Sequence, residues 1–155
     1  LRMGISNEET KSVDVAALVA TIANEEADKG RSISLKGLNH ATILGKPVSL
    51  KRAFSNVIGN AIKFAEVVMV RVEADGNFIL IEVLDDGPGI AESEFEKVFD
   101  PFYRVESSRS RETGGTGLGL TITKAIVSEH GGQIRLANRK RGGLRVTIRL
   151  PLPAQ

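Results

Sequence analysis

The chain has 155 residues, enough for one domain with a proper core, and its 41% hydrophobic and 26% charged residues are ordinary for a globular domain. It contains no cysteine, which excludes disulfides, thiolate metal sites and thiol catalysis. No apolar run reaches the ~18–20 residues that a membrane span needs, and no signal peptide is visible. Residues 1–4 lack the features of a natural N-terminus, so we expect a cytoplasmic fragment of a longer protein.

Hydrophobic periodicity predicts two helices in the first half of the chain. Asp14 can cap a first helix that Gly30 ends. Short strands are expected at residues 33–35 and 42–44, followed by a second helix over about 48–64. The expected core stripes are Val15, Leu18, Val19 and Ile22 on the first helix, and Leu50, Phe54, Val57, Ile58 and Ala61 on the second.

The second half of the chain is predicted to be mostly strand. Strands are expected at 67–73 and 78–84, joined at the hairpin-turn signal Asp75-Gly76-Asn77. A third helix over 116–130 should end at Gly131-Gly132, before a final hairpin that turns at residues 140–143. Helices on one face of a largely antiparallel sheet predict an α+β fold, a two-layer sandwich.

The C-terminal part is strongly basic: after Gly131 there are six basic residues and no acidic one. One interpretation is a nucleic-acid interface, and the other is the solvated outer face of a sheet. Leu144, Val146 and Ile148 alternate with Arg145 and Thr147, which is typical of a half-buried strand. Because no aromatic residues stand between the arginines, we expect an outer sheet face and no nucleic-acid partner.

A motif of two aspartates and two glycines, residues 85–90, follows an apolar alternating run that includes Ile79, Ile81 and Val83. Asp85 continues the phase of these inward residues, so its side chain should point into the protein. Glycines beside it let a ligand approach the backbone. A carboxylate of this kind predicts the floor of a binding site.

A second glycine motif, residues 115–120, opens the third helix, because Ile122, Ala125 and Ile126 follow Leu118 at helical spacing. Backbone N–H groups at a helix N-terminus lie at the positive end of the helix dipole, which suits phosphate. Together with the Asp85 motif it predicts a nucleotide site.

The second helix carries Asn56, Asn60 and Lys63 at i, i+4 and i+7, away from its apolar stripe. On this helix alone a solvated face is the simpler interpretation. The functional alternative is an amide oxygen for a hard cation and a lysine for phosphate, which suits a magnesium nucleotide.

Four motifs follow one another along the chain: Asn56-x-x-x-Asn60-Ala61-x-Lys63-Phe64, Asp85-x-Gly87-x-Gly89, Phe99-x-x-Phe102-Tyr103-Arg104 and Gly115-x-Gly117-Leu118-Gly119-Leu120. In order and spacing they resemble the N, G1, F and G2 boxes of bacterial sensor histidine kinases, and the resemblance covers residues 14–151. It implies the Bergerat fold, shared with DNA gyrase B, Hsp90 and MutL, in which three helices cover one face of a mixed, mostly antiparallel sheet.

The resemblance implies a role for each motif, with ATP and Mg2+ as cofactors. Asn60 would be the magnesium ligand, and Asn56, Lys63 and Arg104 would act on the phosphates as the catalytic set. Asp85 would accept a hydrogen bond from the adenine amino group. The remaining nucleotide-binding residues would be Phe64 against ribose and base, Gly87 and Gly89 keeping the pocket open, Ile90, the lid residues Phe99, Phe102 and Tyr103 (lid 99–114), and Gly115, Thr116, Gly117, Leu118, Gly119 and Leu120.

The family's phosphoacceptor histidine lies on a separate helical hairpin, and neither histidine of this chain can replace it. His130 closes the third helix and is expected to cap it, and His40 stands in a loop with no acidic neighbour. Residues 1–13 are therefore expected to be the tail of that hairpin, and 14–155 the catalytic domain.

The implied partners are ATP or ADP, the parent's hairpin and, indirectly, a response regulator. The parent should be a homodimer, free or anchored in the inner membrane, and the isolated domain a monomer.

Three alternative functions remain at this level. A Bergerat-fold ATPase or an anti-sigma serine kinase would carry glutamate at position 56 as general base, whereas Asn56 cannot take a proton. A non-catalytic nucleotide-binding regulator would be favoured by lost phosphate ligands, yet Asn60, Lys63 and Arg104 are present. The resemblance therefore favours the kinase domain.

Overall fold

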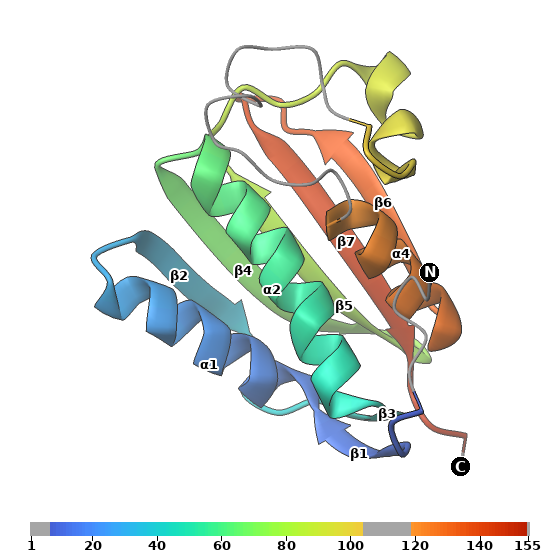
Figure 1. Ribbon diagram of the computed structural model, residues 1–155. Coiled ribbons are helices and arrows are strands. Elements are labelled where there is room, and N and C mark those ends of the chain that lie inside the picture. The colour runs from blue at the N-terminus through green and yellow to red at the C-terminus, as the bar shows by residue number, and fades with distance from the viewer. Residues whose placement is uncertain (1–6, 104–118, 155) are drawn as a thin grey trace.

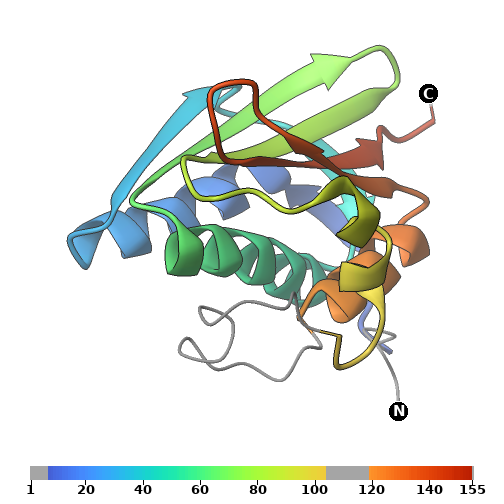
Figure 2. The same ribbon diagram turned by 90° about the horizontal axis from the view of Figure 1, so that it is seen from above.

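The protein folds into two layers, in a computed structural model that describes residues 7–103 and 119–154. Figures 1 and 2 show a twisted sheet with the helices packed on one of its faces. The strand order is β2-β4-β5-β7-β6; β2 runs parallel to β4, and the other neighbours are antiparallel. These strands are β2 (Ser32–Gly37), β4 (Val67–Asp75), β5 (Phe78–Asp85), β6 (Gln133–Asn138) and β7 (Leu144–Pro151). The predicted α+β sandwich is confirmed.

The helical layer consists of α1 (Val15–Asp28), α2 (Pro47–Phe64) and α4 (Gly119–Glu129). Two 3-10 turns, η1 (Glu92–Glu94) and η2 (Lys97–Phe99), lie in the connection after β5. The first residues of the predicted third helix, 116–118, lie outside the described residues. In the described part of the chain, no helix is long and apolar enough to cross a bilayer.

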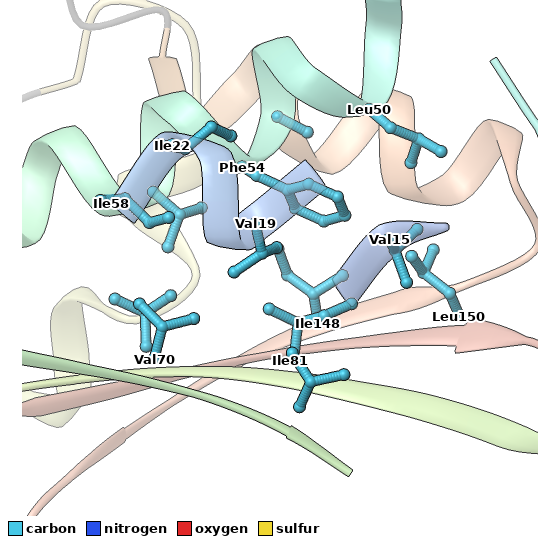
Figure 3. Close-up of a cluster of buried hydrophobic side chains, with 14 of the residues drawn as sticks. Val15, Val19, Ile22, Leu50, Phe54, Ile58, Val70, Ile81, Ile148 and Leu150 are labelled. Atoms are coloured by element: carbon cyan, nitrogen blue, oxygen red, sulfur yellow. The ribbon is translucent and has the colours of Figure 1, made fainter. Parts of the chain in front are cut away.

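The core lies between the helices and the inner face of the sheet (Figure 3). Residues one helical turn apart on α2 point at the sheet, and Phe54, 1% exposed, fills the centre. Burying each such side chain contributes roughly 1.5–3 kcal/mol, so this layer provides most of the stability. The central residues are Val15, Val19 and Ile22 of α1, Leu50, Phe54 and Ile58 of α2, and Val70, Ile81, Ile148 and Leu150 of the sheet.

The buried face of α4 differs from the predicted apolar stripe. Ile126 is fully buried as expected, but Ile122 and Ala125 are only partly buried. Thr123, fully buried, takes a central position because its hydroxyl donates to the Gly119 carbonyl at 2.9 Å. A threonine whose hydroxyl is satisfied within its own helix packs like a β-branched apolar residue, which a purely apolar pattern cannot detect.

Asp14 caps α1 as predicted and also holds a distant loop. Its Oδ1 accepts hydrogen bonds from the Ala17 amide at 3.1 Å and the Ala41 amide at 2.9 Å. Its Oδ2 lies 2.8 Å from Nδ1 of His40. The expectation that His40 has no acidic neighbour is therefore wrong, because the contact joins residues that are distant in sequence. The Ala41 amide is the main cause that lowers the pKa of Asp14 to about 2.

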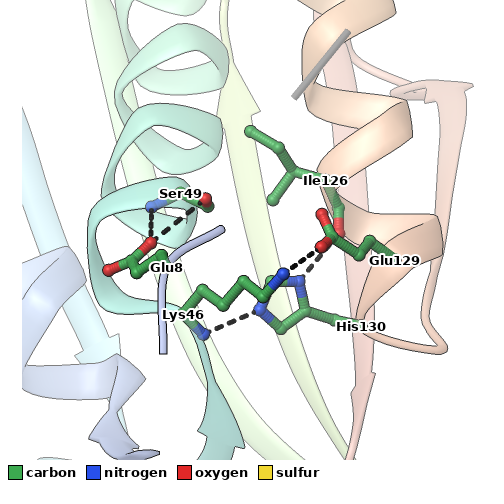
Figure 4. A network of polar contacts seen from close by, with 6 residues as sticks. All are labelled: Glu8, Lys46, Ser49, Ile126, Glu129 and His130. Carbon is green, nitrogen blue, oxygen red and sulfur yellow. Dashed lines mark hydrogen bonds and ion pairs between the residues drawn. The ribbon is translucent and has the colours of Figure 1, made fainter. Parts of the chain in front are cut away.

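The residues just before Asp14 belong to the folded unit. Strand β1 (Lys11–Asp14) pairs with β3 (Thr42–Gly45) in a small antiparallel sheet. Glu8 accepts the Val48 amide at 2.7 Å and the Ser49 amide at 3.0 Å, and so caps α2, whose N-cap residue offers no side-chain cap (Figure 4). Residues 8–13 thus contact the rest of the fold, while the division of the chain at residue 14 into a hairpin tail and a catalytic domain stays a prediction.

His130 caps the end of α4, as predicted, and ties it to the start of α2 (Figure 4). Its Nδ1 lies 2.8 Å from the Ile126 carbonyl oxygen, and its Nε2 accepts the Lys46 amide at 3.0 Å. The Lys46 ammonium also pairs with Glu129. Both ring nitrogens are therefore engaged inside the fold.

Asp14→Ala should lower the free energy of unfolding by about 1 kcal/mol, because it removes a helix cap and leaves the Ala41 amide without its acceptor. The lowered pKa makes this contribution complete above pH 3.8 and progressively smaller as the pH falls toward about 2. Urea denaturation of both proteins over this pH range measures the difference. Asp28→Ala, at the exposed end of the same helix, is the control and should not destabilise. An effect independent of pH would contradict the assignment.

Candidate nucleotide-binding site

An open hollow of about 490 Å³ lies where the end of α2 meets the end of β5. Figure 1 shows these two ends on the same side of the molecule. The hollow therefore combines the end of the polar stripe of α2 with the aspartate–glycine motif that follows β5. Its lining residues are Lys63, Phe64, Ala65, Glu66, Asp86, Gly87 and Pro88.

Asp85 points inward, as its strand phase predicts, and is only 6% exposed. Its Oδ1 accepts hydrogen bonds from two backbone amides, of Gly87 at 2.9 Å and Leu144 at 3.1 Å. No described residue donates to Oδ2, and this atom is not among the fully buried polar atoms without a partner. One carboxylate oxygen is thus fixed by the protein, and the other is available to a ligand.

Asp86 faces the other way and fastens the loop to the start of β4. Its Oδ1 accepts the amides of Glu66 and Val67, each at 2.9 Å, and its own amide donates to the Val67 carbonyl at 3.2 Å. The pKa of Asp86 is lowered, mainly by the Val67 amide and further by that of Glu66. Sequence reasoning did not assign this role, although alternation along a strand does place adjacent aspartates on opposite sides.

The two glycines of the motif are needed by the protein's own packing. A Cβ on Gly87 would lie 2.6 Å from the Phe64 carbonyl oxygen, too close for any side chain. Gly89 has φ +72°, and its Cβ would lie 2.5 Å from Oδ1 of Asn138. Their expected role of keeping an adenine pocket open stays a prediction, but the structure supplies an independent reason for glycine at both positions.

The turn between β6 and β7 holds the same loop from a distant part of the sequence. Asn138 exchanges two hydrogen bonds with the backbone of Ile90, at 3.0 and 2.6 Å. Nη1 of Arg139 donates to the Asp85 carbonyl at 2.8 Å. Sequence reasoning missed both residues, because nothing in the local pattern signals a contact across about fifty positions.

The polar stripe of α2 divides into two parts. Asn56 is half-buried, and its Nδ2 donates to the Gly119 carbonyl at 3.2 Å and to the Thr123 hydroxyl at 3.4 Å, so it holds the first turn of α4. Within the described part of the chain, the side chains of Asn60 and Lys63 form no hydrogen bond or ion pair. These two remain available to a ligand.

The described residues of the predicted lid begin with Phe99 in η2. The Phe99 carbonyl accepts the Thr121 hydroxyl at 2.7 Å, and the Lys124 ammonium lies 5.1 Å from the ring centroid, so η2 packs on α4. Phe102 has φ +64° and is 66% exposed, and the Tyr103 hydroxyl contacts Glu94. Arg104, Gly115, Thr116, Gly117 and Leu118 lie outside the described residues; Gly119 and Leu120 begin α4.

The predicted metal ligand is a single amide. Among the described residues there is no cluster of three histidine, aspartate or glutamate side chains that could hold an ion. Asn60 can offer one oxygen to a magnesium ion that takes its other ligands from phosphate and water, a common arrangement for this ion. The donor set fits a metal that arrives with a nucleotide.

Comparison with known proteins agrees with this geometry. Residues 45–154 match the family described as histidine kinase-, DNA gyrase B- and HSP90-like ATPases. The chain is 39% identical over 145 residues to the sensor histidine kinase GtrS of Pseudomonas aeruginosa. The aligned region covers 94% of this chain but only 30% of GtrS.

Solved structures extend the likeness to the fold. The histidine kinase domain of the Escherichia coli osmosensor EnvZ is 32% identical, with a TM-score of 0.74 and coverage of 97% of this chain and 94% of that domain. The ATP-binding domain of PrrB from Mycobacterium tuberculosis is 28% identical, with a TM-score of 0.78 and coverage of 95% and 100%.

The chain belongs to the histidine kinase-, DNA gyrase B- and HSP90-like ATPases, a family of nucleotide-binding domains. Curated relatives that it matches, such as GtrS, are sensor histidine kinases, and its fold is that of solved histidine kinase catalytic and ATP-binding domains. The motifs around Asn60 and Asp85 that predicted this family are brought to the same edge of the fold by the structure.

Asn56→Asp should lower the free energy of unfolding by about 1–3 kcal/mol, because a carboxylate would face the Gly119 carbonyl where an amide now donates. Asn60→Asp is the matched control: the same change on the same helix, without such a contact, should alter stability by no more than about 0.5 kcal/mol. Chemical denaturation of the two variants makes the comparison. Equal effects would show that Asn56 does not hold α4.

Proposed function

We propose that this domain binds Mg-ATP at the hollow and donates the γ-phosphate to a histidine on a separate helical hairpin of its parent protein. The observation that carries the proposal is Asp85. Its side chain is buried, one oxygen is fixed by two amides, and the other has no donor in the described part of the chain. The family match and the sensor-kinase relatives support the same reaction.

The base would be recognised through Oδ2 of Asp85, which accepts a hydrogen bond from the 6-amino group of adenine. Guanine carries an oxygen there, and two acceptors facing each other would leave a largely buried carboxylate unpaired. Phe64, which lines the hollow, would lie against ribose and base.

The phosphates would lie along the outer part of α2. Lys63 is exposed and lines the hollow, so its ammonium can reach phosphate oxygens. Asn60, one turn earlier, would hold the magnesium ion, which neutralises phosphate charge when bound. Arg104 and residues 115–118 belong to the same proposal by resemblance, although they lie outside the described residues.

Catalysis would rest on positioning and charge neutralisation, since phosphoryl transfer needs little covalent help from the protein. Asn56 cannot act as a general base, and its Nδ2 is committed to α4. This disfavours the ATPase and serine-kinase alternatives, which would activate water or a hydroxyl with a carboxylate at this position.

The acceptor histidine would come from outside this chain. Both ring nitrogens of His130 are engaged in the fold, and His40 is paired with Asp14. The parent would be a homodimeric sensor kinase, with its catalytic domain in the cytoplasm and with or without an inner-membrane anchor. Its phosphohistidine would serve a response regulator, whereas the isolated domain would be a monomer.

Asn60→Ala should remove the magnesium-dependent gain in ATP affinity and leave the melting temperature nearly unchanged, because its side chain forms no hydrogen bond with any described residue. Calorimetric titration with ATP, in magnesium and in EDTA, measures the gain for each protein. Ser55→Ala, an exposed position on the same helix, is the control and should keep it. A full magnesium effect in Asn60→Ala would rule out this ligand.

The domain alone should show no autophosphorylation and only weak ATP hydrolysis, because neither of its histidines lies on a phosphoacceptor hairpin and Asn56 cannot act as a base. Adding the parent's helical hairpin as a separate polypeptide should produce a phosphoprotein that is labile in acid and stable in alkali, as phosphohistidine is. Radiolabelled ATP with acid and alkali washes distinguishes the products. Acid-stable labelling of serine, or brisk hydrolysis by the domain alone, would favour the alternatives.

A further inference from the structure

The orientation of the Asp85 carboxylate is decided by backbone groups. The amides of Gly87 and Leu144 both donate to Oδ1, at 2.9 and 3.1 Å. A backbone N–H can only donate, so the atom between these two amides must be an acceptor. Rotating the carboxylate would merely exchange two equivalent oxygens, but any side chain placed there must turn an acceptor toward the amides.

The Leu144 amide can approach the Asp85 carboxylate because the residue before it, Gly143, has no side chain. Gly143 is buried with φ +103°, and a Cβ there would lie 1.8 Å from the Asp85 carbonyl oxygen. Arg139 closes the turn, since its amide donates to the Gly143 carbonyl at 2.8 Å and its Nη1 to the Asp85 carbonyl at 2.8 Å. The β6–β7 turn is therefore held against both the backbone and the side chain of Asp85.

We propose that the β6–β7 turn, through Arg139, Gly143 and Leu144, is the positioning element that sets base selectivity. It fixes Oδ1 of Asp85 so that a second acceptor, Oδ2, faces the ligand, and a purine with a 6-amino group is selected over one with a 6-oxo group. The inference rests on the proposed nucleotide site and adds to it residues that touch no ligand themselves.

The geometry has a consequence for Asp85→Asn. The asparagine oxygen must replace Oδ1 between the two amides, so the Nδ2 donor must replace Oδ2 toward the ligand. The hydrogen-bonding polarity of the site is thereby reversed. Affinity for ATP should fall at least about tenfold and affinity for ITP, which carries a 6-oxo group, should rise, so that the preference inverts.

The turn offers a matched pair of variants. Gly142 and Gly143 are neighbours with similar φ, +98° and +103°, but a Cβ on Gly142 meets no atom within 4 Å. Alanine therefore brings similar backbone strain at both positions, and only Gly143→Ala displaces Asp85. Gly143→Ala should weaken ATP binding at least about tenfold with little change for ITP, whereas Gly142→Ala should keep the ATP-to-ITP ratio of the wild type.

A second pair of variants, with less disruptive substitutions, tests the proposal even if Gly143→Ala does not fold. Arg139→Met removes the bond to the Asp85 carbonyl and should lower the ATP-to-ITP ratio, whereas Arg141→Met, at an exposed position of the same turn, should not. Calorimetric titration of each protein with Mg-ATP and Mg-ITP gives the ratios, and thermal melting shows that each is folded. A merely structural role of the turn would weaken both nucleotides equally.

The outcomes separate this inference from the proposed function. A wild type that binds neither nucleotide would overturn the nucleotide site itself. A wild type that binds ATP and ITP equally would overturn recognition of the base by Asp85. If the wild type prefers ATP and Asp85→Asn retains that preference, Oδ1 is not fixed by the amides. Equal ratios in Arg139→Met and the wild type, or in Gly143→Ala and Gly142→Ala, would likewise overturn the role of the turn.

Discussion

The candidate site depends on two adjacent carboxylates at the end of one strand. Asp85 points inward, and its carboxylate accepts hydrogen bonds from the amides of the following loop and of β7. Asp86 points outward, and its carboxylate accepts hydrogen bonds from the amides at the start of β4. Each carboxylate satisfies backbone donors that a strand end would otherwise leave unpaired. Three segments are thus joined at one end of the sheet. Oδ2 of Asp85, whose neighbours Asp86 and Gly87 line the hollow, is left without a donor among the described residues.

Helix α2 connects this edge to the rest of the molecule. Its apolar stripe is fixed against the sheet through Phe54 and Ile58, so its polar stripe has only one possible direction. On this polar stripe, Asn56 donates a hydrogen bond to the start of α4. Asn60 and Lys63 follow on the same stripe toward the end of the helix, where Lys63 lines the hollow. The same packing that stabilises the fold therefore sets where phosphate-binding groups can lie.

The ends of the helical layer are joined by contacts that are distant in sequence. Glu8 caps α2 in place of a local N-cap residue, and His130 links the end of α4 to the Lys46 amide beside the same helix start. These polar groups occupy donors and acceptors that helix ends leave unsatisfied. The chain before α1 and the helix that follows the predicted lid consequently share one network.

The sequence by itself determined most of the elements, the buried face of α2 and the motif residues, because periodicity, turn residues and the linked boxes are local signals. It placed Asp85 inward, Asp14 at a helix cap and the core stripe of α2 correctly. It did not detect Thr123 as a core residue, Asp14 as the partner of His40, or Asn138, Arg139 and Gly143 as supports of the Asp85 loop. Only the tertiary structure decided these, because each depends on a backbone group or side chain brought close by folding, and no local pattern of residues encodes that proximity.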